Sequence, residues 1–282
     1  MTIRTIAVVG AGTMGHGIAH AAIAGGYETQ MYDVSDPAVE RGRAGIEAIV
    51  ARGVDLGKVD AAAARAMLDR LRTTTSLADA LEGADLVIEA APERIDLKLA
   101  LFAQIEQLAP ADAIVASNTS ALSITEMAGS LTRPARVAGM HFFNPVHKLK
   151  LIEIVRALES SDATLQAIED VARQMGKETV LVRESPGFIT TRVNASIGNE
   201  AFYMLMEGVA SARDIDKALK LGLNHPMGPF ELVDLVGLDT RLNILEYLHG
   251  SLGEKYRPCP LLIQYVKAGR LGRKVGKGVY EY

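Results

Sequence analysis

The stretch GMHFFNPVHKLKLIEIV, residues 139–155, places His141 at the end of an apolar run and Glu153 in the next β-rich run. An imidazole accepts a proton near neutral pH, and a carboxylate can orient the ring and stabilise its charged form. The two residues could form the proton-accepting pair of an oxidoreductase if the intervening turn returns the chain antiparallel. Taken singly, His141 could serve structure only, and Glu153 could equally be an ordinary strand residue.

His147 is a second candidate for the proton acceptor. It lies in the expected loop and is followed by Lys148 and Lys150. Neighbouring cations lower the pKa of an imidazole, and the local composition indicates a solvated loop. We therefore favour His141.

Residues 6–33 carry the pattern of a nucleotide-binding βαβ unit. An apolar run at 6–9 predicts a buried strand, and a glycine-rich motif follows at once. Its first glycine permits a tight turn, its second lets the backbone approach a diphosphate, and its third allows close packing of helix on strand. We expect the motif to contact the cofactor through Gly10, Gly12, Thr13, Met14 and Gly15.

Asp33 ends the second predicted strand, where an acid accepts hydrogen bonds from the adenosine ribose hydroxyls. Its carboxylate would repel the extra phosphate of NADP, so the sequence favours NAD. His16 and His20 are spaced like a metal-binding pair on the predicted helix. No third ligand is near them in the sequence, and we predict no metal.

Apolar runs and helical patterns alternate over about 180 residues, which is typical of a doubly wound parallel sheet. Two helices between residues 36 and 71 exceed what a simple crossover needs and indicate an inserted helical pair. Further strands are predicted at 86–89, 113–116, 137–140, 151–155 and 179–182, with helices at 95–108 and 163–175.

The pattern changes near residue 184. Ser185 is a good N-cap and Pro186 suits a first helical turn, and the pattern that follows predicts almost only helices. We predict an α/β domain over 1–184 and an all-α domain over 185–282. The helices carry more apolar faces than a small unit can bury, which favours a second subunit.

Three predicted strand ends carry polar residues. Glu93 and Lys98 follow the strand at 86–89, the sequence SNTS at 117–120 follows the next, and His141 and Asn144 end the third. Each group could be ordinary turn or cap residues. Ligands of doubly wound sheets bind at the carboxyl ends of the strands, so all three should open onto the nicotinamide site.

The composition excludes several classes of protein. The chain has 282 residues and a net charge of −4, which gives no basic footprint for nucleic acid or anionic membranes. Its one cysteine, Cys259, cannot form an internal disulfide. No stretch has the roughly 18 apolar residues of a membrane span, and the first ten residues do not resemble a signal peptide. We expect a cytoplasmic protein.

The chain resembles the short-chain 3-hydroxyacyl-CoA dehydrogenases along its length, from residue 3 to residue 282. The resemblance is carried by the following segments: VVGAGTMGHGIA, DLVIEAAPE, SNTSALSIT, GMHFFNPV, LIEIV, SPGFI, HPMGPFELVDLVGLD and GRKVGKGVYEY. It implies a Rossmann-type domain with an inserted helical hairpin, a helical domain that forms a homodimer, and an acyl-CoA substrate.

The resemblance also implies roles for individual residues. His141 matches the catalytic base, Glu153 its carboxylate partner, and Ser120 the serine that hydrogen-bonds the substrate oxygen. Asp33 matches the ribose ligand. The other matched cofactor contacts are Glu93, Lys98, Ser120, Asn144 and Lys274.

Three positions depart from the family pattern. Thr191 replaces an asparagine that helps to hold the thioester, and Asn194, one helical turn on, could substitute for it. Ile49 and Leu56 stand where relatives have the serine and lysine that contact CoA. Arg52 and Lys58 are alternative partners for the CoA phosphates.

The weakened CoA contacts leave room for an alternative, a dehydrogenase of a free hydroxy acid or sugar acid on the same scaffold. A non-catalytic nucleotide-binding protein is a remoter alternative, because its chemistry should have decayed. The presence of His141, Glu153 and Ser120 argues against it.

Overall fold

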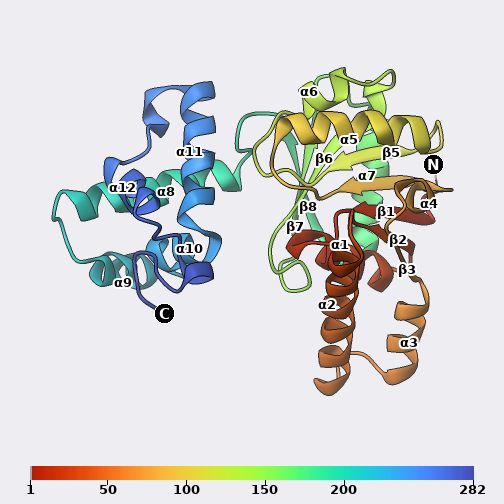
Figure 1. The fold of residues 1–282 in the computed structure, drawn as a ribbon, viewed down its shortest axis with the longest axis horizontal. Coiled ribbons are helices and arrows are strands. Elements are labelled where there is room, and N and C mark those ends of the chain that lie inside the picture. Colours follow the sequence, from red (N-terminus) through yellow and green to blue (C-terminus); the bar gives the residue numbers. More distant parts are fainter. Residues whose placement is uncertain (1) are drawn as a thin grey trace. The chain divides into compact units, whose positions relative to one another are not determined.

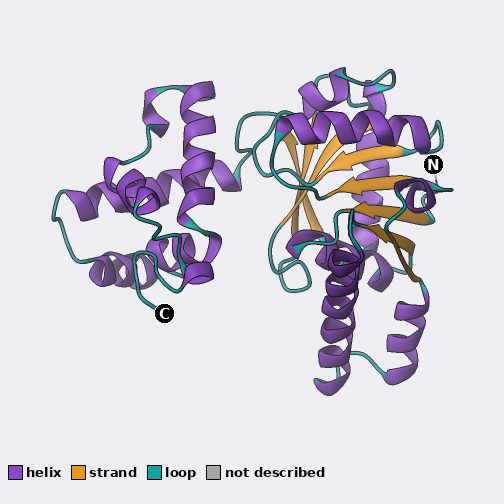
Figure 2. Ribbon diagram, in the orientation of Figure 1, coloured by secondary structure: helices purple, strands orange, loops and turns teal. Residues whose placement is uncertain are grey.

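A computed structural model describes residues 2–282. The chain divides into two compact units, Met1–Glu184 and Ser185–Tyr282, which we describe separately (Figure 1). The first combines a sheet with helices, and the second is helical (Figure 2). The α/β class with a helical C-terminal part is therefore confirmed.

In residues 2–184, eight strands form one sheet in the order β3-β2-β1-β4-β5-β6-β7-β8. The strands are β1 (Thr5–Val9), β2 (Glu28–Tyr32), β3 (Leu71–Thr74), β4 (Leu86–Glu89), β5 (Ile114–Ser117), β6 (Val137–Phe142), β7 (Leu151–Arg156) and β8 (Glu178–Arg183). The helices are α1 (Thr13–Ala24), α2 (Asp36–Asp55), α3 (Ala61–Asp69), α4 (Leu77–Leu81), α5 (Ile95–Leu108), α6 (Ile124–Gly129) and α7 (Asp162–Gln174). All residues of β4, β5 and β6 are buried, as expected for strands covered on both faces.

The doubly wound parallel sheet is present, and the antiparallel return considered between His141 and Glu153 occurs at one edge. The six strands β1 to β6 run parallel, but β7 pairs antiparallel with β6, and β8 follows the direction of β7. A parallel connection needs a crossover of about a dozen residues or more. Residues 143–150 are too few for one, so the chain must return antiparallel. The sequence pattern missed β3, whose residues LRTT lack an apolar run.

Helices cover both faces of the sheet (Figure 1). Apolar side chains of α1 and α7 share one core with those of the strands, including Ile18, Ile23, Ile168 and Val171. The predicted helical pair is present as α2 and α3, which extend away from the sheet (Figure 1). The pair is an insertion between β2 and β3 rather than a crossover that packs only on the sheet.

The second unit contains α8 (Thr190–Met206), α9 (Ala212–Gly222), α10 (Pro229–Val236), α11 (Leu238–Leu252) and α12 (Pro260–Lys267). The rings of Phe202 and Phe230 meet edge-on in its core, with centroids 5.2 Å apart. The predicted helix start at Ser185 is wrong. Gly187 and Phe188 have φ of +73° and +49°, which breaks a right-handed helix, and α8 begins at Thr190.

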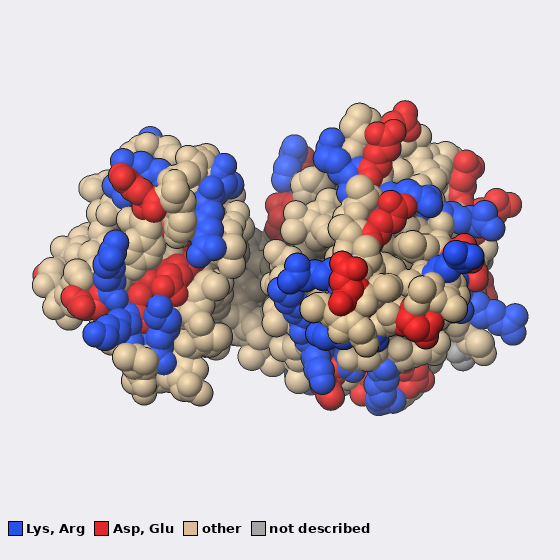
Figure 3. All heavy atoms as spheres, turned by 90° about the horizontal axis from the view of Figure 1, so that it is seen from below, with Lys and Arg blue, Asp and Glu red and all other residues tan. Residues whose placement is uncertain are grey.

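Among the described residues, no helix is both long and apolar enough to cross a membrane. On the face drawn in Figure 3, Lys and Arg side chains occur beside Asp and Glu over both units, and neither sign covers it. This mixture agrees with the net charge of −4.

Candidate active site

The glycine-rich loop joins β1 to α1. Gly10 has φ of +111°, and a Cβ at Gly15 would lie 1.7 Å from the carbonyl oxygen of Gly10. Both positions therefore require glycine for the turn and for close packing of the helix. A Cβ at Gly12 would meet nothing within 4 Å, and this residue caps α1 without a side-chain hydrogen bond. The loop thus presents open space and the N-terminal amides of α1, which fits a diphosphate.

Asp33 follows β2 and touches the same loop. One carboxylate oxygen accepts a 2.8 Å hydrogen bond from the amide of Ala11, and the other accepts one of 2.8 Å from Val34. Each oxygen has a second lone pair, which could accept a hydrogen bond from a ribose hydroxyl. The glycine-rich loop and Asp33 therefore fit the adenosine half of NAD and its diphosphate.

His141 and Glu153 face each other across β6 and β7. The Nδ1 atom of His141 lies 2.7 Å from Oε2 of Glu153, and the two residues are 5% and 0% exposed. A carboxylate on Nδ1 favours the tautomer whose proton is on Nδ1, which puts the lone pair on Nε2. The ring of Phe143 lies 4.4 Å from the imidazole, centroid to centroid.

The carboxyl ends of β5 and β6 are tied together beside this pair. The Oδ1 atom of Asn118 accepts a 2.8 Å hydrogen bond from the amide of Phe142, the residue after His141. Asn118 is buried. Because Asn118 fixes the backbone next to the imidazole, it helps to set the direction of the ring.

A buried ionic cluster lies at the end of β4. The carboxylate of Glu89 accepts hydrogen bonds from Nζ of Lys98 at 2.6 Å and from Oγ of Ser117 at 2.5 Å. Lys98 is 1% exposed and also bonds the carbonyl of Ala91 at 3.2 Å. Its ammonium therefore lies inside the protein, not on an open surface.

Glu93 connects this cluster to the serine predicted to meet the substrate. Its Oε1 atom accepts hydrogen bonds from Thr119 at 2.5 Å and from the amide of Ser120 at 2.8 Å. Its Oε2 atom lies 3.6 Å from Nζ of Lys98. Glu93 thereby fixes the loop that carries Ser120.

The remaining predicted site residues lie elsewhere. Asn144 is exposed in the loop after β6, and Arg52 and Lys58 are exposed at the end of the hairpin helix α2 and in the turn that follows. In the second unit, Nζ of Lys274 bonds both carboxylate oxygens of Asp239 at 2.6 and 2.7 Å. Thr191 and Asn194 are half-buried on α8, one turn apart.

His147 does not take part in the pair with Glu153. Its ring contacts that of His20, with centroids 6.3 Å apart. Burial and then the positive charge of Lys148 lower the pKa of His147.

Sequence reasoning missed the roles of Glu89 and Asn118. Glu89 appeared to be the last residue of an apolar strand, and Asn118 an ordinary turn residue. A carboxylate at the end of a buried strand is a signal, because such a group needs a partner. The partner itself, Lys98, cannot be read from spacing.

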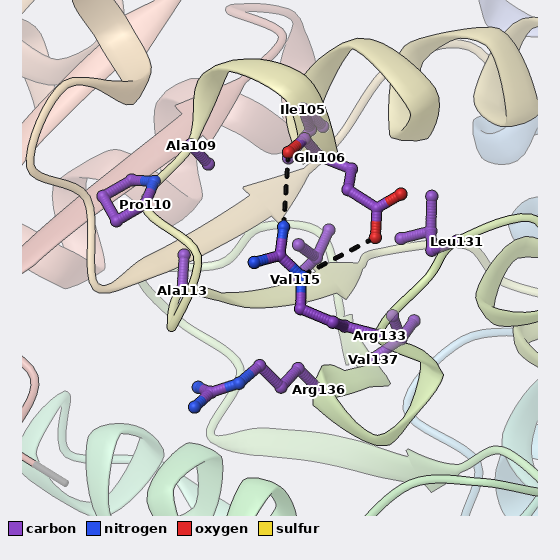
Figure 4. A pocket seen from close by; sticks show the side chains of 10 residues that line it. All are labelled: Ile105, Glu106, Ala109, Pro110, Ala113, Val115, Leu131, Arg133, Arg136 and Val137. Carbon is purple, nitrogen blue, oxygen red and sulfur yellow. Dashed lines mark hydrogen bonds and ion pairs between the residues drawn. The ribbon is translucent and has the colours of Figure 1, made fainter.

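The cavity in Figure 4 lies at the other end of the strands from the glycine-rich loop. It is lined by Pro110 and Ala113, before β5, and by Arg133 and Val137, at the start of β6. Arg133 bonds the carbonyl of Ala111 at 2.6 Å, and its Nε lies 3.8 Å from Oε1 of Glu106. These are the amino ends of the strands, so we do not assign the active site to this cavity. Across residues 2–282, no three His, Cys, Asp or Glu side chains are grouped to hold a metal ion.

Comparisons with known proteins agree along the whole chain. Residues 5–185 match the model of the NAD-binding domain of 3-hydroxyacyl-CoA dehydrogenase, and residues 187–282 match that of its C-terminal domain. A probable 3-hydroxybutyryl-CoA dehydrogenase of Bacillus subtilis is 46% identical, with 100% of this chain and 98% of the relative aligned. A 3-hydroxybutyryl-CoA dehydrogenase of Bradyrhizobium diazoefficiens is 43% identical over 99% of this chain and 96% of its own.

A crystal structure of the (S)-3-hydroxybutyryl-CoA dehydrogenase of Ralstonia eutropha superposes with a TM-score of 0.96. It is 45% identical, and the match covers 100% of this chain and 99% of that one. The family models, the relatives and the solved structure agree with the geometry of the glycine-rich loop and the buried imidazole–carboxylate pair. The chain therefore belongs to the 3-hydroxyacyl-CoA dehydrogenase family of NAD-dependent oxidoreductases.

Proposed function

We propose that this protein catalyses the reversible, NAD-dependent oxidation of a short (3S)-3-hydroxyacyl-CoA to the 3-oxoacyl-CoA, with 3-hydroxybutyryl-CoA as the expected substrate. The observation that carries the proposal is the buried 2.7 Å contact between His141, near the carboxyl end of β6, and Glu153, opposite it in β7. The same sheet carries the glycine-rich loop. The names of the relatives in B. subtilis and R. eutropha support the short acyl chain.

His141 acts as the base. When bound, NAD supplies the hydride acceptor. As the carbinol carbon loses its hydride, Nε2 of His141 takes the hydroxyl proton, and the carboxylate of Glu153 stabilises the resulting imidazolium. In the reverse direction the imidazolium returns the proton to the carbonyl oxygen.

Ser120 donates a hydrogen bond to the reacting oxygen and so holds the substrate for proton transfer. Glu93 bonds the amide of Ser120 at 2.8 Å, which supports this position. Gly10, Gly12, Thr13, Met14 and Gly15 hold the diphosphate, and Asp33 holds the adenosine ribose. Glu93, whose side chain is 41% exposed, contacts the cofactor, and buried Lys98 acts through it.

The first unit serves as the NAD-binding domain and the second as the substrate and dimerisation domain. Thr191 and Asn194 hold the thioester, and Lys274 adds a cofactor contact. Several large apolar side chains of the second unit are exposed, including Val209, Leu221 and Leu223 at 64%, 77% and 66%, which supports burial against a second copy. We propose a cytoplasmic homodimer.

A substrate comparison tests the assignment. We expect NAD reduction with (3S)-3-hydroxybutyryl-CoA and little with free 3-hydroxybutyrate, because a 3-hydroxyacyl-CoA dehydrogenase binds its substrate through the CoA part. Absorbance of NADH follows both reactions. Equal turnover of the free acid would favour a hydroxy-acid dehydrogenase on this scaffold.

A further inference from the structure

The loop between β5 and α6 carries Ser120 and is held at its two ends by different carboxylates. Glu93 holds the first end, through hydrogen bonds from Oγ1 of Thr119 and the amide of Ser120 at 2.5 and 2.8 Å. Glu184 holds the other end, where the loop enters α6. The reaction proposed above gives Glu184 no role.

The carboxylate of Glu184 accepts three hydrogen bonds from the start of α6. Its Oε1 atom accepts one of 2.5 Å from Oγ of Ser123. Its Oε2 atom accepts one of 2.7 Å from the amide of Thr125 and another from the hydroxyl of the same residue. Hydrogen bonds to a charged acceptor are about twice as strong as those between neutral groups. Glu184 therefore fixes the first turn of α6.

The two hydroxyls that meet Glu184 also bond the protein backbone. Ser123 is the N-cap of α6, and its Oγ atom accepts a 3.0 Å hydrogen bond from the amide of Glu126. Oγ1 of Thr125 accepts one of 3.0 Å from the amide of Leu158, in the turn after β7. Each hydroxyl thus donates to the carboxylate and accepts from an amide, which fixes its direction.

Glu184 itself is fixed to the part of the sheet that carries Glu153. It follows β8 directly, and its amide donates a 3.0 Å hydrogen bond to the carbonyl of Arg156, the last residue of β7. The same strand, β7, holds Glu153 opposite His141. The contacts of Glu184 therefore tie the loop of Ser120 to the strands that position the base.

The proposed reaction requires Ser120 and His141 to approach one substrate oxygen together. A shift of about 1 Å in a group of this kind can lower the rate about 100-fold. Asn118 links the ends of β5 and β6 before the loop begins. Residues 118–123, which the structure describes in full, form neither strand nor helix. The position of Ser120 therefore depends on what holds the two ends of this loop.

We propose that Glu184 is a positioning residue for Ser120, which rests on the function proposed above. Its carboxylate holds the start of α6 beside the turn after β7, and thereby sets where Ser120 presents its hydroxyl to the reacting oxygen. Glu184 takes no part in proton transfer itself, and its effect on the rate passes through Ser120.

The experiment is a double-mutant cycle with Glu184→Gln and Ser120→Ala. A glutamine keeps the length of the side chain but has only one acceptor oxygen, so it cannot accept from both Ser123 and the amide of Thr125 as the carboxylate does. Reduction of acetoacetyl-CoA by NADH gives kcat and both KM values for the wild-type protein, the two single variants and the double variant. Urea titration shows that each protein is folded under the assay conditions.

We expect Glu184→Gln to lower kcat about 10- to 100-fold, because the hydroxyl of Ser120 no longer meets the reacting oxygen. KM for NADH should not change. In the Ser120→Ala background, the same substitution should lower kcat by less than about two-fold, since the hydroxyl that Glu184 positions is absent. Thr125→Val removes one of the three hydrogen bonds to Glu184 and keeps the shape of the side chain. It should show a smaller loss with the same dependence on Ser120.

Glu126→Gln is the matched control, because Glu126 is an exposed carboxylate of the same helical turn, and it should leave kcat unchanged. An equal loss from Glu184→Gln with and without the Ser120 hydroxyl would overturn the proposal, as would wild-type kcat in Glu184→Gln. If Glu184→Gln does not fold, Thr125→Val takes its place in the cycle. Failure of the wild-type protein to reduce acetoacetyl-CoA, or full turnover by Ser120→Ala, would instead refute the function proposed above, and this inference with it.

Discussion

The Nδ1 atom of His141 lies 2.7 Å from Oε2 of Glu153 because the two residues stand directly opposite each other in the antiparallel pairing of β6 and β7. Both are almost fully buried. Water therefore competes little for their hydrogen bond, and the carboxylate keeps the ring in one orientation.

Replacement of His141 by alanine should leave NAD binding intact and lower kcat. Loss of a general base costs about 100- to 10,000-fold in rate. Stopped-flow or steady-state NADH absorbance gives kcat, and a fluorescence titration gives the Kd for NADH. Turnover close to that of the wild-type protein would show that another group takes the proton.

Glu153→Gln preserves the shape of the side chain and removes its charge. We expect kcat to fall by about 100-fold or more, because the amide no longer stabilises the imidazolium or selects its tautomer. KM for acetoacetyl-CoA and the midpoint of urea unfolding should change little. A variant with unchanged kcat would reduce Glu153 to an ordinary strand residue.

Lys98→Met should destabilise the protein strongly. It removes the 2.6 Å partner of Glu89 and leaves a carboxylate buried at 0% exposure. Breaking a buried pair in this way costs about 3–5 kcal/mol in the free energy of unfolding. Urea titration followed by circular dichroism measures the loss, and Glu89→Gln in the Lys98→Met background should recover part of it.

Arg241→Met should have the opposite effect. Arg241 is 2% exposed, its Nε atom has no hydrogen-bond partner, and burial lowers its pKa to about 10. Replacing a buried charge by an apolar side chain of similar length should stabilise the protein by about 1–4 kcal/mol. Arg213→Met, on the exposed surface of α9, serves as the control and should stay within about 0.5 kcal/mol of the wild-type value.

His20 should make stability depend on pH. Its pKa is lowered from 6.5 to about 4, first by burial and then by the nearby basic groups. Between these values the unfolded chain binds a proton that the folded protein does not, so this contribution is present above pH 6.5 and is lost as pH falls towards 4. The loss is at most about 3 kcal/mol.

The difference in unfolding free energy between wild-type protein and His20→Gln, measured by urea titration at several pH values, isolates this effect. The slope between pH 6.5 and 4 should be shallower in the variant. Parallel curves for the two proteins would show that His20 titrates normally in the fold.

The sequence predicted the elements that repeat a local pattern. The apolar runs of β4 and β5 and the helix at 95–108 were found to within one residue, because burial on both faces and helical period leave clear patterns. The strand LRTT has no such pattern, since its pairing with β2 alone makes it a strand.

The candidate site divides in the same way. The turn glycines and Asp33 could be recognised because their function depends on neighbours close in the sequence. The contacts of Glu89 with Ser117 and of Glu184 with Ser123 join distant segments, and only the folded chain brings them together. Ser185 appeared to be a cap because its type fits, but the positive φ of Phe188 sets the true helix start.

The connection formed by residues 143–150 tolerates insertions that the strand after it does not. The hydrogen bonds between β6 and β7 fix the register of the two strands. An insertion near the tip of this connection therefore leaves His141 and Glu153 facing each other. One extra residue inside β7, ahead of Glu153, would turn that carboxylate to the far face of the sheet. The tip of this connection can therefore change in length and charge, and so in what it binds. The pairing that proton transfer needs does not tolerate a shift of even one residue.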